Sequence, residues 1–142
     1  DELLNDPLGR GYASMDEVEV IHSLIEVDRD VLIPIRSDDL LAWSAMSGRF
    51  MKIKRAMEDE TKTDELRSIA WAAMKMIERD STDLDLNHSD RASMLDTLVA
   101  AEILSESDKN DLYTTATQTV SRAHELNIRL PLQRDDIIKA RA

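Results

Sequence analysis

The histidines and the missing cysteines limit the chemistry that this chain of 142 residues could perform. His22, His88 and His124 are scattered and lack the His-Glu-x-x-His spacing of a metal site, so they predict surface or helix-terminal side chains. Without cysteine there are no disulfides and no cysteine-ligated zinc or iron–sulfur site. A serine hydrolase would need a motif such as Gly-x-Ser-x-Gly, which is missing. We therefore expect no catalytic residue, no metal and no cofactor.

Carboxylates are the remaining candidates for chemistry. Adjacent acids occur at Asp38-Asp39, Glu58-Asp59-Glu60 and Asp135-Asp136. These pairs fall at predicted helix ends, where the helix dipole already explains them. The run Asp83–Asn87 has the alternating oxygen ligands that begin a calcium loop, but His88 stands where Gly is needed and Met94 where Glu is needed. Its leucines also fit a short half-buried strand. A protein without enzymatic activity is therefore the favoured interpretation.

The net charge is −11, and the acidic excess is spread over both halves of the chain. Arg49, Lys52, Lys54 and Arg55 form the only basic cluster, and Glu58-Asp59-Glu60 follow it closely. Because these acids would repel phosphates, we interpret the cluster as a solvated helix face and do not expect nucleic-acid binding; DNA contact is the alternative. The acidity itself fits a solubility device, with a basic partner or DNA mimicry as alternatives.

Helices must position any site, because apolar residues recur mostly at helical spacing. The pattern predicts helices over Met15–Val27, 37–57, Asp64–Arg79, 89–103, 108–126 and Asp135–Arg141. Ser14 and Glu17 match a capping box, and Thr63 is a plausible cap. The second helix is either continuous or bent at Gly48. Asn127 stands where a helix often exits through a left-handed residue.

Two extended segments interrupt the helices. Ile33-Pro34-Ile35 and Leu130-Pro131-Leu132 both enter an acidic helix start, and they could pair as a short two-stranded ribbon. The expected fold is all-α, an irregular bundle of about five or six helices. We expect an extended N-terminal arm over 1–13 and a single helical domain over 14–142. No apolar run approaches the ~20 residues of a membrane span, and no secretory signal is seen, so we expect a soluble protein and no membrane.

Several segments together resemble a family of small proteins encoded in tailed-bacteriophage genomes, near the virion structural genes and mostly without an assigned function. The resemblance is carried by Asp6-Pro7-Leu8-Gly9-Arg10-Gly11-Tyr12-Ala13 with Met15, by Asp38–Ser44, by Ser121-Arg122-Ala123-His124-Glu125-Leu126 and by Ala140-Arg141-Ala142. Asn127 departs from the glycine usual in the family. The family offers no catalytic or binding residue to carry over.

The resemblance implies a virion component of the tail or of the neck between head and tail. Such a protein would reside in the virion, and in the host cytoplasm before assembly, with other virion proteins and copies of itself as partners. We expect Asp6, Leu8, Arg10 and Tyr12 to be contact residues, because Arg and Tyr are enriched at interface hot spots. An arm folded on its own domain is the alternative. The rival function is an acidic, host-directed inhibitor or DNA mimic.

Overall fold

The computed structural model describes residues 2–79 and 83–142, and it divides the chain into two compact units. Unit 1 combines Asp1–Val31 with Gln118–Ala142, and unit 2 is the continuous segment Leu32–Thr117. This division differs from the expected arm over 1–13 and single domain over 14–142. The physical reason is that two separate sets of apolar faces each enclose their own core. The fold is mainly helical, as predicted for an all-α protein.

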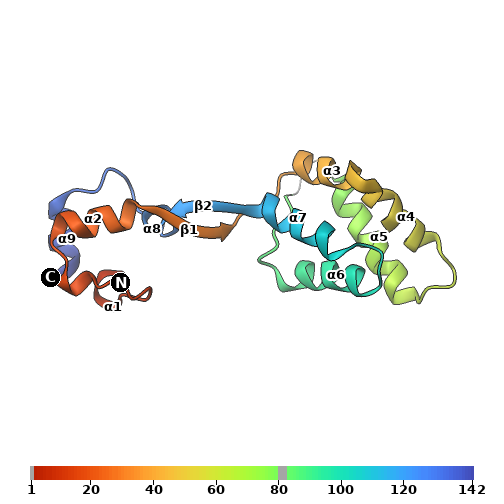
Figure 1. The fold of residues 1–142 in the computed structure, drawn as a ribbon, viewed down its shortest axis with the longest axis horizontal. Coiled ribbons are helices and arrows are strands. Elements are labelled where there is room, and N and C mark those ends of the chain that lie inside the picture. The colour runs from red at the N-terminus through yellow and green to blue at the C-terminus, as the bar shows by residue number, and fades with distance from the viewer. Residues whose placement is uncertain (1, 80–82) are drawn as a thin grey trace. The chain divides into compact units, whose positions relative to one another are not determined.

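Unit 2 contains the longer helices (Figure 1). They are α3 (Ser37–Ala45), α4 (Arg49–Glu58), α5 (Asp64–Glu78), α6 (Ser89–Ala100) and α7 (Glu106–Ala116). The Thr63 hydroxyl caps α5 by accepting the Leu66 N–H at 3.3 Å, as predicted. A 3-10 turn, Met46–Gly48, separates α3 from α4, with Ser47 and Gly48 in the left-handed region. The bent alternative for the second predicted helix is therefore confirmed.

The core of unit 2 is built from the apolar stripes of these helices. Its buried members include Leu40, Trp43, Ile53, Ala70, Met74, Leu95, Leu98 and Leu112. Ile35 and Leu84, both in segments predicted to be extended, form an antiparallel bridge at one side of this core. The strand interpretation of the Asp83–Asn87 run is thus supported at Leu84. The oxygen Asp85 Oδ1 accepts from the Asn87 backbone and side chain, each at 2.9 Å.

Unit 1 contains shorter elements from the two ends of the chain. Its helices are α1 (Glu2–Asn5), the 3-10 turn Tyr12–Ser14, α2 (Glu17–Ile25), α8 (Arg122–Glu125) and α9 (Arg134–Arg141). The small core consists of Leu3, Tyr12, Val20, Leu24, Ala123 and Ile137. Asp16 and Glu19 form the capping box of α2, so the prediction of Ser14 and Glu17 was off by two residues. Asn127, with φ of 54°, takes the predicted left-handed exit after α8.

A two-stranded antiparallel ribbon is present, but its partners differ from the prediction. Strand β1 (Val27–Leu32) pairs with β2 (Thr117–Ser121), and the two run side by side in Figure 1. Leu130-Pro131-Leu132 does not pair with Ile33-Pro34-Ile35; Leu132 instead packs on the core of unit 1. The pairing of the two proline segments was therefore wrong, because each was drawn into the core of a different unit.

The long helix predicted over 108–126 was also wrong. Helix α7 ends at Ala116, and the next five residues, Thr117–Ser121, form β2 before α8 begins. Thr117, Thr119 and Val120 are β-branched, which disfavours a helix and favours a paired strand. No helix in the described part of the chain is long and apolar enough to cross a membrane.

Candidate functional site

The predicted contact residues of the N-terminal segment are engaged within unit 1. Tyr12 is 0% exposed, and its hydroxyl donates to Glu2 Oε1 at 3.3 Å. The Arg10 guanidinium donates to both carboxylate oxygens of Asp28, at 2.8 and 3.0 Å, and to the Ser23 carbonyl. Leu8 stays partly exposed. The segment is thus packed on its own unit, which was the alternative to a free docking arm.

Asp6 organises the turn that brings Arg10 and Tyr12 into place. Its Oδ1 accepts the backbone N–H of Arg10 and its Oδ2 that of Gly11, each at 2.7 Å. Gly11 has φ of 81°, a conformation that glycine adopts without the steric cost of a Cβ. The run that carries the family resemblance is therefore a structured loop whose aspartate and glycine have defined conformational roles.

A charged clamp in unit 1 joins the two ends of the chain. The Arg122 guanidinium donates to Glu2 at 2.7 and 2.9 Å and to Glu125 at 2.8 Å. Arg141 on α9 donates to the backbone carbonyls of Tyr12 and Met15. Hydrogen bonds from Arg122 lower the pKa of Glu2 and of Glu125 and raise the pKa of Arg122 itself. Arg122, within one of the segments that carry the resemblance, thus has a structural role.

A second cluster of charged side chains lies inside unit 2, where Arg49 starts α4 and Asp108 lies in the first turn of α7. Arg49 Nε donates to Asp108 Oδ1 at 2.7 Å, and both side chains are about 95% buried. The guanidinium also contacts Asp111 and lies 5.0 Å from the centroid of the Trp43 ring. Trp43 Nε1 in turn donates to the Asp108 carbonyl at 3.0 Å. These contacts tie three helices together.

Asp108 is held as an anion in this cluster. Burial by itself would raise the pKa of its carboxyl, but N–H donation from the Ser105 backbone and from Arg49 outweighs burial and lowers the pKa to about 2. Lys52 adds a positive charge, its Nζ lying 3.6 Å from Asp108 Oδ2. Within the described residues no buried side-chain polar atom lacks a partner. The cluster is therefore fully satisfied, which favours a structural role over a reactive one.

The interpretation of the basic cluster as a solvated helix face is wrong for Arg49. Arg49 is 5% exposed and ion-paired, so it does not belong to a solvated helix face. Lys54 does fit that interpretation, because it pairs with Glu58 at 3.9 Å on the surface. The helix dipole opposes a cation in the first turn of α4, so Arg49 is stabilised there by its tertiary partners, which no local pattern reports.

No group of three or more His, Asp or Glu side chains is placed to hold a metal ion among residues 2–79 and 83–142. His88 lies 3.9 Å from Asp85 at the surface, before α6. The three histidines come from separate elements: α2, the residue before α6, and α8.

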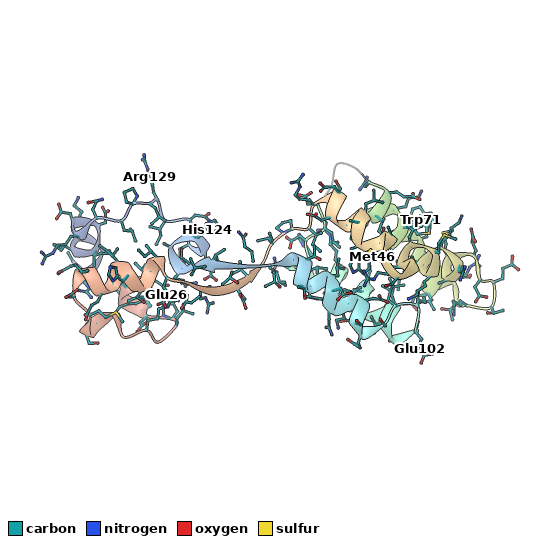
Figure 2. All side chains as sticks on the ribbon, turned by 45° about the horizontal axis from the view of Figure 1, so that its top comes forward. Glu26, Met46, Trp71, Glu102, His124 and Arg129 are labelled. Carbon is teal, nitrogen blue, oxygen red and sulfur yellow. The ribbon has the colours of Figure 1, made fainter. Side chains whose placement is uncertain are left out.

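An exposed apolar surface on unit 2 is a stronger candidate for function. Leu41, Met46, Met51 and Trp71 are between 46% and 64% exposed. Leu41 and Met51 line a groove of about 330 Å³, together with Phe50 and Ile77. Glu78 also lines this groove, and Trp71 lies on the same side of α5, seven residues earlier. We call Leu41, Met46, Phe50, Met51 and Trp71 the apolar surface of unit 2, and Met46 and Trp71 are labelled in Figure 2.

The composition of this surface is typical of protein interfaces. Aromatic residues and methionine are enriched at the centre of such interfaces, and tryptophan is the most frequent hot-spot residue. Methionine side chains adapt to partners of different shape because they are flexible and polarizable. The break at Met46–Gly48 leaves Met46 outside the core, whereas Trp43 before it and Ile53 after it are buried.

Comparison of the chain with protein-family models, with curated proteins and with solved structures finds no match.

Proposed function

We propose that this chain is a structural or accessory component of a tailed-bacteriophage virion, in the tail or the neck, without enzymatic activity. It acts through contacts with other virion proteins, and it resides in the host cytoplasm until assembly. The observation that carries this proposal is the apolar surface of unit 2. Trp71 exposes 54% of its surface and Met46 exposes 64%, and Leu41, Phe50 and Met51 line a groove on the same unit. Exposed hydrophobic side chains gain free energy when a partner removes them from water.

The resemblance to small phage proteins supports the virion location, and the apolar surface supports contact with protein. The side chains of Asp6, Arg10 and Tyr12 are engaged inside unit 1. We therefore assign the contact role to the apolar surface of unit 2 instead.

Quantitative mass spectrometry of purified particles of the encoding phage tests the location. The proposal expects the chain at a fixed copy number per particle. If the chain is instead found only in infected cytoplasm, bound to a basic host protein and displaced by DNA or by high salt, the acidic inhibitor is the correct function. In that case the net charge of −11 would provide the attraction to the basic partner.

Trp71→Ala tests the surface. We expect roughly thirtyfold less chain in purified particles, because loss of a tryptophan hot spot at an interface costs about 2 kcal/mol or more. Val18→Ala on α2 is the matched control, since Val18 is also 54% exposed but belongs to unit 1. Helical content measured by far-UV circular dichroism should be unchanged in both. Equal incorporation of the two variants would disprove a role for the apolar surface.

A further inference from the structure

A second groove in unit 2, of about 650 Å³, lies between the end of α4 and the link from α6 to α7. Its two sides carry opposite charges. Lys52, Arg55 and Lys62 come from α4 and the turn after it, and we call them the basic wall. Glu102 and Glu106 come from the link and the first residue of α7, and we call them the acidic wall.

The two walls are only partly neutralised: Lys52 is paired with Asp108 of α7 at 3.6 Å, and Asp59 also lines the groove. Arg55, Glu102 and Glu106 are exposed, and none of them forms an ion pair within the described part of the chain. Lys62 is paired at 3.9 Å with Asp59, which lies on its own side of the groove. Between the walls the lining is apolar, formed by Ala56, Val99, Ala101, Ile103 and Leu104. Ala56, Ile103 and Leu104 are already buried, so what the groove offers a partner is the unpaired charge of Arg55 on one side and of Glu102 and Glu106 on the other.

Glu102 is held at the edge of this groove at a conformational cost. Helix α6 ends at Ala100, and the Ile103 N–H donates to the Leu98 carbonyl while the Glu102 N–H donates to that of Val99. This is the Schellman arrangement, in which the residue at the position of Glu102 is usually glycine. Glu102 has φ of 58°, a left-handed conformation that is sterically unfavourable for a residue with a Cβ. This turn places Glu102 at the edge of the groove.

We propose that this groove is the contact between two copies of the chain, related by a twofold axis that runs along the groove. Rotation about such an axis places the basic wall of one copy opposite the acidic wall of the other, twice in the interface. Arg55 of each copy then faces Glu102 and Glu106 of its partner. A surface with one positive and one negative side is complementary to itself in this way and repels partners with a single sign of charge.

The interface is independent of the proposed virion function. It shares no lining residue with the groove beside the apolar surface of unit 2. In Figure 2, Trp71 and Glu102 lie toward opposite edges of unit 2. A pair of copies joined through the charged groove thus leaves both apolar surfaces free for another partner.

Sedimentation velocity of the full chain and of two charge-reversed variants tests the proposal. We expect the native chain to form dimers, and Arg55→Glu and Glu102→Lys each to raise the dimer dissociation constant on the order of tenfold or more, because each places like charges opposite one another twice. An equimolar mixture of the two variants should recover the dimer, since the acidic surface of one then faces the basic surface of the other. Recovery by mixing distinguishes charge pairing from a general loss of folding.

Arg129→Glu is the matched control for Arg55→Glu, because Arg129 is exposed, belongs to unit 1 and its reversal makes the same change in net charge. It should leave the dimer unchanged. Far-UV circular dichroism monitors folding, and if a reversed variant unfolds, Arg55→Gln and Glu102→Gln replace the pair and should each weaken the dimer several-fold. A native chain that remains monomeric at about 100 µM, a dimer indifferent to the groove variants, or a mixture that does not associate would each overturn the proposal.

Discussion

Unit 1 and unit 2 form their cores from different arrangements of the chain. Unit 2 is one continuous segment, and consecutive helices such as α4 and α5 pack against each other. Unit 1 brings the first and last helices together, with Glu2 and Arg122 in contact across 120 positions of sequence. Contacts between residues close in sequence cost less chain entropy than distant ones. Unit 2 is therefore expected to fold without help, whereas unit 1 depends on both ends of the chain.

The ion pairs differ in the same sense. In unit 2, Arg49 and Asp108 are buried inside a core of many apolar side chains. In unit 1, the side chains of Arg122 and Glu2 are also largely buried, but the core beside them has only six buried residues among those described, and the Arg141 contacts help to hold the segments together. The comparison teaches that a small core assembled from distant segments is supported by directed polar contacts, and a larger local core by burial.

The largest effect should come from removing residues 122–142. This truncation takes away Arg122, Ala123 and Ile137, so unit 1 loses both its clamp and part of its core. Hydrogen exchange read by mass spectrometry should show α2 exchanging as fast as an unstructured chain, while α5 remains protected. Retained protection in α2, or its loss in α5, would contradict the separation into two units.

Arg49→Ala should destabilise unit 2 by about 3–5 kcal/mol, because it leaves the buried Asp108 carboxylate without its main partner. Urea unfolding followed by far-UV circular dichroism measures the change. Lys54→Ala is the control on the same helix, and it should cost about 0.5 kcal/mol or less, since the Lys54–Glu58 pair is exposed. Similar effects of the two variants would show that the buried pair contributes no more than a surface pair.

Acid should weaken unit 2 through Asp108. The pKa of this carboxyl is about 2 in the folded chain against an ordinary value of 3.8, so its contribution is complete above pH 4 and is lost as the pH falls from about 4 to 2. The shift corresponds to about 2 kcal/mol. The free energy of unfolding, measured across this pH range, should depend less on pH in Asp108→Asn than in the native chain. Asp96→Asn, at an exposed partner of Lys109, should leave the pH dependence unchanged.

The smallest effect is expected where two helices end in a residue of left-handed conformation, Glu102 in unit 2 and Asn127 in unit 1. Glu102→Gly in unit 2 should raise the free energy of unfolding by about 1 kcal/mol, because glycine adopts the positive φ without strain. Asn127→Gly in unit 1 should gain only a few tenths of a kcal/mol, since asparagine tolerates this conformation. Thermal unfolding at dilute concentration, below any association, measures both. Equal gains would mean that the side chain at position 102 carries no extra strain.

Helical content and several boundaries were predictable from local patterns. Thr63 and Asn127 were assigned correctly because a cap and a left-handed exit depend on a few neighbouring residues. The break at Gly48 was one of two stated alternatives. The strand over Thr117–Ser121 was missed, because its apolar positions also fit a helical stripe and only pairing with Val27–Leu32 decides between them.

The candidate sites were less predictable. Tyr12 and Arg10 were expected at an interface from their residue types, but burial in unit 1 decides their role. Arg49 was expected at the surface because its partner Asp108 lies 59 positions away. The charged groove joins α4 to the link after α6, and no local pattern reports that two such segments face each other.

By itself, the sequence determined a mainly helical protein with an acidic surface, no cysteine chemistry and most of its helix ends, because these properties depend on composition and on spacing within one or two turns. The tertiary structure alone decided the division into two units, the partners of the ribbon, the burial of Tyr12 and Arg49, and the exposure of Trp71. These features depend on which apolar faces pack together across distant parts of the chain. The free energy of that packing depends on several segments at once and cannot be predicted from any one of them.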